Sequence, residues 1–514
     1  MNSKRILPFL ILVILLVSCK QQELVRPLPE VDYTDLSNLY GFNLLENFIN
    51  EGESKPYLEN DFKLIAENGF NFVRLPLDYR CLTMEDDWGT LNEDAMKVLD
   101  QAIEFGNKYG IHVCINLHHA PGFCINFRDY YSADSTLWTG TAAQEAFYSL
   151  WRQMAARYKG ISNNQLSFNL LNEPVRTTRE IYVDIAIKAV EAIYEEDPER
   201  LVMSDGWNVG SDPIPELVPY KVVQMLRGYY PMNLTHYGAG WTNNTYGPVP
   251  EWPSNTNLVH SIYAPSHNHL HVPFLLQHNF EKETPVGIEL LEVFDKCRVL
   301  VKADNHVLLD KTFDPENDQV VDRSYNQERE MYHAAYLETI EVMVPAGSGS
   351  LTIEVAGGDK ITYGKVAVWL DGKDHEPVNI IPGNIWGGAP IPVVIKDDNT
   401  FVTVNDMNPN WDSIYRADYL EPWIRFRKEH NIGIMVGEWG VYQRAPIDVS
   451  LEWMEYMLNT WKEYDLGWAM WNFRGSFGVA DSNREGVEYT EMDGISVDMK
   501  MMELLKQGAE ESFY

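Results

Sequence analysis

The sequence predicts an α/β protein built on a (β/α)8 TIM barrel. An all-β, β-sandwich-like domain is inserted between the sixth strand and the sixth helix. Three observations carry this prediction. Short apolar runs rich in Val, Ile and Phe alternate with stretches of 3.6-residue periodicity, the pattern of parallel βα units. Eight such runs occur, the number that closes this barrel. The interval between the sixth and seventh runs is about 200 residues long and shows two-residue periodicity instead.

The predicted strands each end where an apolar run meets polar or aromatic residues. They are 41–45, 70–76, 112–118, 166–172, 201–205, 222–226, 434–438 and 467–471. The predicted helices carry apolar residues at three- and four-residue spacing. They are 57–68, 93–109, 142–158, 180–195, 417–429, 451–464 and 500–507. The fifth crossover, 212–220, contains Pro213, Pro215 and Pro219, so we expect at most one helical turn there.

The long interval has the pattern of an antiparallel sheet. Apolar and polar residues alternate in runs bounded by Gly, Asp and Asn, which is typical of half-buried sandwich strands. These runs are 298–303, 338–344, 350–355 and 365–370. We expect Tyr363 and Trp369 in the core of this domain. Its role stays open between glycan binding, a rigid spacer and a lid over the cleft of the barrel.

These patterns divide the chain into segments. The barrel is predicted in two parts, residues 36–257 and 395–514, with the inserted domain at 272–373. The flanks 243–257 and 376–392 are rich in Pro, Gly and Asn and are predicted to be linkers. An insertion at a loop of the barrel rim leaves the barrel strands free to pair.

The first residues have the pattern of an export signal. Lys4 and Arg5 precede an apolar run, 6–17, that is too short to span a bilayer as a helix. Its Leu-Val-Ser-Cys ending resembles a bacterial lipobox, which implies cleavage after residues 1–18 and lipidation of the Cys19 thiol. Residues 19–35 are predicted to form a polar tether. We expect an exported lipoprotein, anchored by lipid to a membrane at the periplasm or cell surface. The alternative is an ordinary signal peptide with an incidental cysteine.

The composition excludes several classes of partner. The chain has 41 Lys and Arg against 75 Asp and Glu, a net charge of -34. Such a surface repels phosphate backbones, so nucleic acid is not expected as a partner, whereas neutral ligands are compatible with it. Five cysteines in 514 residues do not make a disulfide scaffold. Cys81 and Cys124 fall in neighbouring predicted loops and are either a pair or two free thiols. The sequence makes no prediction about protein partners.

Two glutamates stand where predicted barrel strands end. Glu173 lies in Asn172-Glu173-Pro174 at the end of the fourth strand, and Glu438 ends the seventh. The carboxyl ends of barrel strands build the active-site face. Two carboxylates in one cleft divide acid/base and nucleophile roles when their environments separate their pKa values. Cleavage of a glycosidic bond uses such a pair.

These residues stand in motifs that resemble glycoside hydrolase family 5, the cellulase-like retaining enzymes. The resemblance covers about residues 36–250 and 400–510. Its six motifs, in chain order, are Gly41-Phe42-Asn43-Leu44, Phe72-Val73-Arg74-Leu75-Pro76, Asn116-Leu117-His118-His119-Ala120-Pro121-Gly122, Leu171-Asn172-Glu173-Pro174, Val436-Gly437-Glu438-Trp439-Gly440 and Trp471. Each motif alone is weak, but their order and spacing along a barrel are specific.

The resemblance implies a role for each matched residue. Glu173 is expected as acid/base and Glu438 as nucleophile. Arg74 lies beneath the nucleophile, Asn172 contacts the sugar 2-hydroxyl, and Trp471 lies under the sugar at the cleavage point. His118 matches a family histidine in the third-strand motif.

The physical chemistry of these residues agrees with those roles. Arg74 can donate a hydrogen bond that favours ionised Glu438. Apolar surroundings and the charge of Glu438 should keep Glu173 protonated until that charge is lost. Read from the residues alone, His118 could also be a satisfied core histidine, and Trp471 a core tryptophan.

No metal or other cofactor is expected. His118 and His119, with Asp129 nearby, could suggest metal ligands, but neighbouring residues on a strand point to opposite faces.

The sixth strand departs from the family pattern. The family carries His-x-Tyr there, and alignment places Arg227 at the histidine and Tyr229 at the tyrosine. Arg227 either binds a substrate hydroxyl or carboxylate, or lowers the pKa of Glu173 and weakens its acid role. Alternatively, His236 swings in from the following loop.

Aromatic residues in the predicted loops are candidates for sugar contacts. Trp207 and Trp241 are expected as sugar platforms at outlying subsites. Tyr79, Phe123 and Tyr130 are further candidates to line the cleft.

The sequence therefore predicts a retaining hydrolase of β-linked glycans, expected to act as an endo-β-glucanase on polysaccharide or oligosaccharide. Alternatives with the same residues are an exo-acting β-glucosidase, a β-mannan hydrolase and a transglycosylase. A non-catalytic glycan-binding surface lipoprotein is the alternative of another class, although it would not need both carboxylates. Retention predicts that the carboxyls of Glu173 and Glu438 lie about 5–5.5 Å apart.

Overall fold

The structure is a computed structural model. It describes residues 26–49, 54–85, 87–125, 136–242, 249–253, 258–326, 330–382, 389–403 and 415–509. The predicted signal peptide, Cys19, Asp129 and Tyr130 lie outside these residues. None of the helices among the described residues is long and apolar enough to cross a bilayer.

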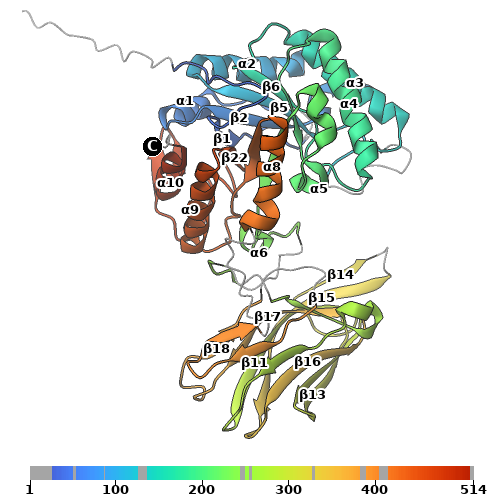
Figure 1. The fold of residues 1–514 in the computed structure, drawn as a ribbon, viewed down its shortest axis with the longest axis vertical. Helices are drawn as coiled ribbons and strands as arrows, with labels where there is room; N and C mark the ends of the chain where they lie inside the picture. Colours follow the sequence, from blue (N-terminus) through green and yellow to red (C-terminus); the bar gives the residue numbers. More distant parts are fainter. Residues whose placement is uncertain are drawn as a thin grey trace, which may run out of the picture.

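Eight parallel strands close into a barrel, as the alternation of apolar runs predicts (Figure 1). Their order follows the chain, each strand pairing with the next and the last with the first. They are β1 (Tyr40–Asn43), β2 (Phe72–Asp78), β5 (His112–His119), β6 (Leu166–Asn169), β7 (Val202–Asp205), β8 (Val223–Gly228), β21 (Ile434–Trp439) and β22 (Gly467–Met470). The (β/α)8 barrel prediction is confirmed.

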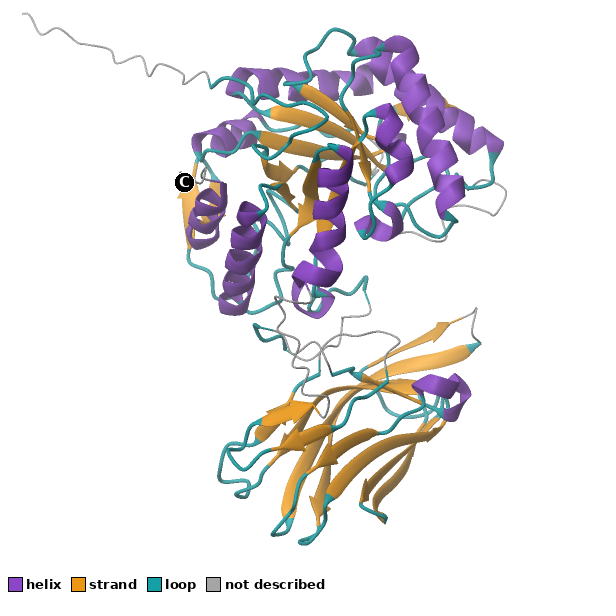
Figure 2. Ribbon diagram, viewed as in Figure 1, coloured by secondary structure: helices purple, strands orange, loops and turns teal. Residues whose placement is uncertain are grey.

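Helices surround this barrel (Figure 2). The longer ones are α1 (Glu59–Glu67), α2 (Glu93–Tyr109), α3 (Thr141–Arg157), α4 (Arg179–Glu196), α8 (Glu421–His430), α9 (Ile447–Glu463) and α10 (Met499–Ala509). A π-helical turn, η6 (Tyr415–Leu420), precedes α8. The predicted crossover stretch 212–220 forms the 3₁₀ helix η4 (Pro215–Tyr220), because prolines there remove backbone donors. Short elements on the loops are η1 (Tyr79–Cys81), β3 (Thr83–Met84), β4 (Asp87–Leu91), α5 (Trp207–Gly210), α6 (Met232–Thr235), β23 (Tyr489–Met492) and β24 (Ile495–Asp498).

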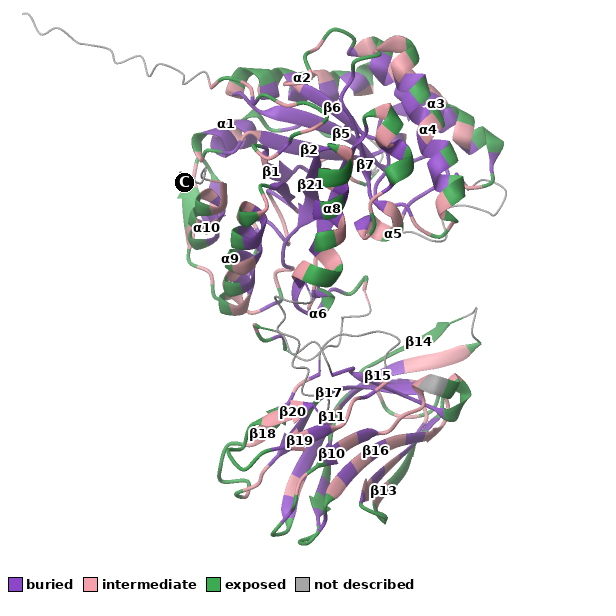
Figure 3. Cartoon of the chain, in the orientation of Figure 1, coloured by how far each residue is buried: buried purple, intermediate pink, exposed green. Residues whose placement is uncertain are grey.

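The barrel interior is apolar at one end and polar at the other. Alternate residues of each strand share a face, so β7 places Met203 and Asp205 on one side, and β8 places Met225 and Arg227 likewise. The apolar members form one small buried cluster with Phe72 and their counterparts on other strands. The polar members follow toward the carboxyl ends of the strands. Burial along the barrel strands is nearly complete (Figure 3). The fold thus concentrates buried charge where the strands end.

A larger cluster of buried residues joins the outer faces of the strands to the helices. Its largest fully buried side chains are Trp151, Trp423, Trp439, Trp453, Trp461 and Trp468. Trp439 lies at the end of β21, with its ring 4.8 Å from that of Trp461 and 5.4 Å from that of Trp468. The residue after Glu438 is therefore anchored in the core, which fixes the backbone that carries Glu438.

Between β8 and α8 in chain order, the described residues form two six-stranded sheets, which pack around one hydrophobic cluster (Figure 1). One sheet contains β10 (Phe274–Gln277), β12 (Cys297–Ala303), β13 (His306–Phe313), β16 (Ser350–Gly357), β19 (Val393–Ile395) and β20 (Phe401–Thr403). The other contains β9 (Ser261–Tyr263), β11 (Thr284–Phe294), β14 (Asp322–Asn326), β15 (Met331–Val344), β17 (Lys360–Val368) and β18 (Val378–Ile380). A 3₁₀ helix, η5 (Pro265–Leu270), follows β9.

The sheets extend beyond the predicted range 272–373. The predicted linker 376–392 contains β18, a three-residue strand too short to show a periodicity. Tyr363 is buried as predicted, with its hydroxyl donating to the carbonyl of Val259 at 2.8 Å. Trp369, which was expected in the core, is only half-buried, because it lies just beyond the end of β17. The Lys373 ammonium lies 5.4 Å from the centroid of its ring.

Candidate active site

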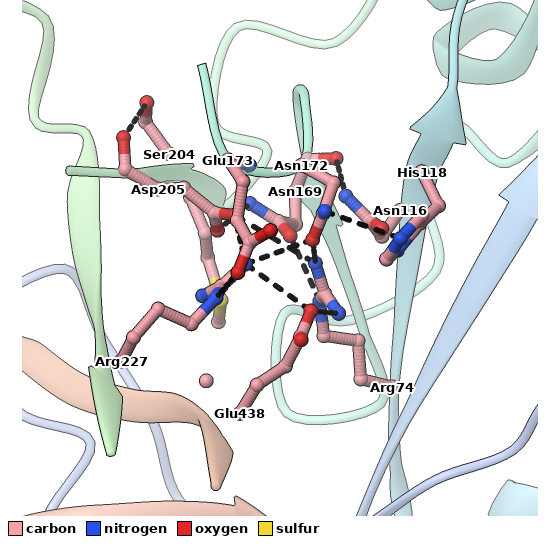
Figure 4. A network of polar contacts seen from close by, with 12 residues as sticks. Arg74, Asn116, His118, Asn169, Asn172, Glu173, Ser204, Asp205, Arg227 and Glu438 are labelled. Carbon is pink, nitrogen blue, oxygen red and sulfur yellow. Dashed lines mark hydrogen bonds and ion pairs between the residues drawn. The ribbon is translucent and has the colours of Figure 1, made fainter. Parts of the chain in front are cut away.

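Charged, amide and imidazole side chains from seven barrel strands, or from the residues just after them, meet at one end of the barrel, and Figure 4 draws most of them. They are Asn43, Arg74, His118, Asn169, Asn172, Glu173, Asp205, Arg227 and Glu438. All of them are buried except Glu173, which is partly exposed. Side chains distant in sequence therefore share one hydrogen-bonded network.

Glu438 lies on β21 and is held by two guanidinium groups. Its Oε1 accepts from Arg74 Nη1 at 2.6 Å and from Arg227 Nη2 at 3.1 Å. Its Oε2 accepts from the Tyr229 hydroxyl at 3.3 Å. Two cationic donors therefore converge on one carboxylate oxygen of Glu438. The hydrogen bond predicted from Arg74 is present.

Arg74 is fully buried and its donors point at four partners. Besides Glu438, Nε donates to Asn169 at 2.9 Å, Nη1 to Asn43 at 3.0 Å and Nη2 to Asn172 at 3.0 Å. A guanidinium fixed on so many sides cannot turn away, so it also fixes the position of Glu438.

Glu173 stands in a different environment. It follows β6 with a backbone φ of 47°, and its side chain is 14% exposed. Its Oε1 accepts from Arg227 Nε at 3.0 Å. Burial raises the pKa of Glu173 to about 7, against the lowering effect of Arg227 and with the help of the charges of Glu438 and Asp205. The two glutamates thus differ in the way that acid and nucleophile roles require.

Arg227 lies between the two glutamates. Besides them, its Nη2 donates to Asn172 Oδ1 at 2.8 Å and makes a very short contact with Asp205 Oδ2. Arg227 lowers the pKa of Glu173, which is one of the two effects expected from the sequence. Burial of Glu173 raises its pKa by more than Arg227 lowers it. The contacts of Arg227 with Glu173, Glu438 and Asp205 are internal ion pairs made through Nε and Nη2, whereas its Nη1 is buried and has no hydrogen-bond partner among the described residues.

His236 does not take the place of the family histidine. Its Nδ1 lies 3.0 Å from the Thr235 hydroxyl, and its ring packs 5.0 Å from Tyr229 and 5.4 Å from Phe477. Burial lowers the pKa of His236 to about 4, so the ring is neutral. The His236 ring packs edge to face against Tyr229, and the hydroxyl of Tyr229 donates to Glu438.

Asp205 is a site residue that sequence reasoning missed. Its Oδ2 also accepts from the backbone N–H of Glu173 at 2.8 Å, and its Oδ1 accepts from Asn169 at 3.2 Å. The available signal was its position, since Asp205 ends the fifth barrel strand as Glu438 nearly ends the seventh. No motif marked it.

His118 and Asn172 form the side of the network nearest Trp471. Asn172 Nδ2 donates to His118 Nε2 at 3.2 Å, while its Oδ1 accepts from Arg74 and Arg227. Burial, together with His119 and Arg74, lowers the pKa of His118 far below its usual value, so this ring is a neutral acceptor. The rings of His118 and Trp471 stack at 5.4 Å, and Trp471 is half-buried. The Trp471 ring is therefore fixed beside the polar network.

His119 points elsewhere, as strand alternation predicts. Its Nδ1 lies 2.9 Å from Asp78 Oδ2. Among the described residues, no group of three or more His, Cys, Asp or Glu has a geometry that suits a metal ion.

The outer aromatic residues divide into buried and exposed ones. Trp241 is 58% exposed, with its ring 4.9 Å from that of Tyr442. Trp207 is half-buried and stacks on the core residue Tyr182 at 6.1 Å. Tyr79 and Phe123 are 2% and 4% exposed, so they pack in the core and do not line a cleft. Cys81 and Cys124 are buried thiols and not a disulfide.

Fold and site together define a (β/α)8-barrel protein with two glutamates, one buried and one partly exposed, at the carboxyl ends of its strands. Residues 33–321 match the model of the cellulase family, glycosyl hydrolase family 5. The chain belongs to this family.

Named relatives agree with this assignment. Endoglucanase C of Acetivibrio thermocellus is 33% identical over 201 residues, covering 38% of this chain and 57% of the relative. Cellodextrinase A of Ruminococcus flavefaciens is 33% identical over 214 residues, covering 40% of this chain and 58% of the relative. The chain thus spans little more than half the length of these relatives. A solved structure described as a glycoside hydrolase aligns with 92% of this chain and 99% of its own, at 25% identity and a TM-score of 0.58.

Proposed function

We propose that this protein is a retaining glycoside hydrolase that cleaves β-linked glucans within the chain. The observation that carries the proposal is the pair of glutamates held by one arginine. Arg227 contacts both Glu173 and Glu438, so one guanidinium spans the pair. Such closeness supports the short carboxyl separation that distinguishes retaining from inverting enzymes.

In the proposed first step, a Glu438 oxygen attacks the anomeric carbon and forms a covalent glycosyl–enzyme ester. The bond to the leaving oxygen breaks, and that oxygen takes the proton of Glu173. In the second step, the now ionised Glu173 removes a proton from water, whose oxygen attacks the same carbon and releases Glu438. Glu173 ends the cycle protonated. Two inversions give net retention.

The names of the relatives support a β-glucan substrate, and the neutral charge of such a glycan suits a strongly acidic protein. The test is a panel of β-glucans, β-mannans and xylans with the product sizes recorded over time. An endo-β-glucanase releases a spread of oligosaccharides from β-glucan early in the reaction. Release of glucose alone would favour the exo-acting β-glucosidase, and a preference for mannan would favour the β-mannan hydrolase. No turnover of any glycan that binds would favour a binding lipoprotein.

The pKa of Glu173 predicts the alkaline side of the pH profile. Glu173 must be protonated to donate to the leaving oxygen, and burial raises its pKa to about 7. We expect kcat/KM on an unactivated β-glucan to fall about tenfold per pH unit above that value. Initial rates from pH 4 to 9 measure this limb. A limb near pH 5 would contradict the protonated state of Glu173.

We also propose that the two sheets are a separate β-sandwich-like domain inserted in the barrel. Their hydrophobic cluster shares no residue with the barrel clusters among the described residues. Replacing 258–403 by a short Gly/Ser linker should therefore leave a folded barrel, with a melting temperature within about 5 °C of the parent. The largest buried tryptophans are all in the barrel, so near-UV circular dichroism reports on it directly. Loss of that signal would mean that the sheets share in the stability of the barrel.

Export and lipid anchoring at Cys19 are part of the proposal. The run before Cys19 supports them. In a bacterial host, the parent protein should incorporate labelled palmitate and fractionate with membranes, whereas Cys19→Ser should do neither, because the acyl chains supply the affinity for the membrane. Palmitate incorporation by Cys19→Ser would place the modification elsewhere.

A further inference from the structure

The site contains a nearly balanced set of buried charges. Two guanidinium groups and three carboxyl groups face one another across the barrel end. We call them the charge cluster; its members are Arg74, Arg227, Glu173, Asp205 and Glu438. With Glu173 protonated, two positive charges meet two negative charges. With Glu173 ionised, the cluster carries one surplus negative charge.

The other titratable groups that face Glu173 and Arg227 are neutral near pH 7. Burial keeps the pKa of His118 far below its usual value. Burial also raises the pKa values of Tyr229 and Tyr419, which lie near both charges. His236, behind Tyr229, is uncharged as well. The charges that act on the pKa of Glu173 are those of Arg227, Glu438 and Asp205, which are all members of the charge cluster.

Asp205 supplies one of the negative charges of the cluster from a fully buried position. Its side chain has no exposed surface, and its oxygens are occupied by Arg227, Asn169 and the backbone N–H of Glu173. A second guanidinium atom, Arg74 Nη2, lies 3.9 Å away. Asp205 thus touches both the cation that contacts Glu173 and the backbone that carries Glu173.

We propose that Asp205 is a positioning residue that keeps Glu173 protonated in the free enzyme by neutralising Arg227. This inference rests on the proposed function and deepens it. Formation of the glycosyl ester removes the charge of Glu438, which leaves the cluster with a surplus positive charge while Glu173 is neutral. Ionisation of Glu173 then restores the balance. The same cluster thus favours the acid before the first step and the base after it.

Two substitutions that change the charge of the cluster in opposite directions test this proposal. Asp205→Asn leaves a surplus positive charge, so the alkaline limb of kcat/KM on a β-glucan oligosaccharide should move down by about one pH unit or more. Arg227→Gln leaves a surplus negative charge, so the limb should move up by a similar amount. The double variant restores neutrality and should return the limb toward the parent value. An unmoved limb in Asp205→Asn, or a shift of both single variants in one direction, would overturn the inference.

A second readout separates charge from loss of structure. An aryl β-glucoside with a strongly acidic phenol needs little help from an acid in the first step. At pH 7, Asp205→Asn should therefore lose much more activity on the oligosaccharide than on formation of the glycosyl–enzyme from the aryl glucoside. Equal losses on both would indicate misfolding and count against the proposed role.

The titration of Glu173 is also measurable without turnover. Carbon-13 NMR of glutamate-labelled protein follows it, with Glu173→Gln identifying the signal. Asp205→Asn should lower the observed midpoint by about one pH unit. A parent protein that turns over no glycan would overturn the proposed function, while the NMR midpoints alone would still decide the role of Asp205. An unchanged midpoint would overturn that role even in an active enzyme.

Discussion

Glu438→Gln should lower kcat on a soluble β-glucan by roughly 10⁴-fold or more, while the Kd for the glycan changes only a few-fold. An amide oxygen is a poor nucleophile, so the covalent step is lost. The glutamine has the same shape, and its oxygen can still accept from Arg74 and Arg227, while its amide nitrogen can donate to the Tyr229 hydroxyl. Binding is expected to persist because the rest of the site is unchanged. Initial rates and isothermal titration calorimetry measure the two quantities.

A matched control tests whether this loss belongs to the site. Glu292 on β11 is a half-buried glutamate, and desolvation raises its pKa to about 7, with Lys360 opposing that effect. Glu292→Gln makes the same chemical change in the β-sheet region and should leave kcat within about twofold. Turnover within tenfold of the parent in Glu438→Gln would remove the nucleophile assignment, whatever the control does.

The strands were predictable because each is an apolar run, but their ends were not. The fourth strand was predicted over 166–172, yet its ladder ends at Asn169. Beyond it, the chain turns so that Glu173 takes a positive φ and donates its N–H to Asp205. That partner is 32 residues away, so no local pattern records the turn.

The strands of the two sheets also show which elements sequence patterns can predict. The strands with long alternation, such as β12 and β16, were predicted within two residues. Strands of three residues, such as β18 and β19, carry too few positions for a two-residue period to be visible. Pairing with neighbours distant in sequence defines them as strands.

Within the site, the predictable part was what the family motifs contain. The contact of Arg74 with Glu438 follows from the motifs, and the structure contains it. The position of Arg227 was predicted, but its partners were not. The contact between Arg227 and Asp205 joins two residues that no motif links. The pKa of Glu173 depends on how far burial outweighs the charge of Arg227, and burial is a property of the folded chain. Net effects of opposing electrostatic contributions require the folded geometry.

Glu173→Ala should show a loss of activity that depends on the leaving group. On a β-glucan, whose leaving sugar needs a proton, we expect kcat/KM to fall by roughly 10²–10⁴-fold. On an aryl β-glucoside with a strongly acidic phenol, formation of the glycosyl–enzyme should be almost as fast as in the parent. The second step still lacks its base, so the phenol should appear in a burst followed by slow turnover.

Added azide should restore that slow step, because an anion that needs no deprotonation can attack the glycosyl ester in the space left by the carboxyl group. The product would be a β-glycosyl azide, which reports both the vacated position and retention at the anomeric carbon. Removal of Glu173 should also abolish the alkaline limb near pH 7 on the aryl substrate, since the group that titrates there is gone. Equal losses on both substrates, with no burst and no azide product, would assign the acid/base role to another residue, because only the loss of a proton donor and base makes the defect depend on the leaving group.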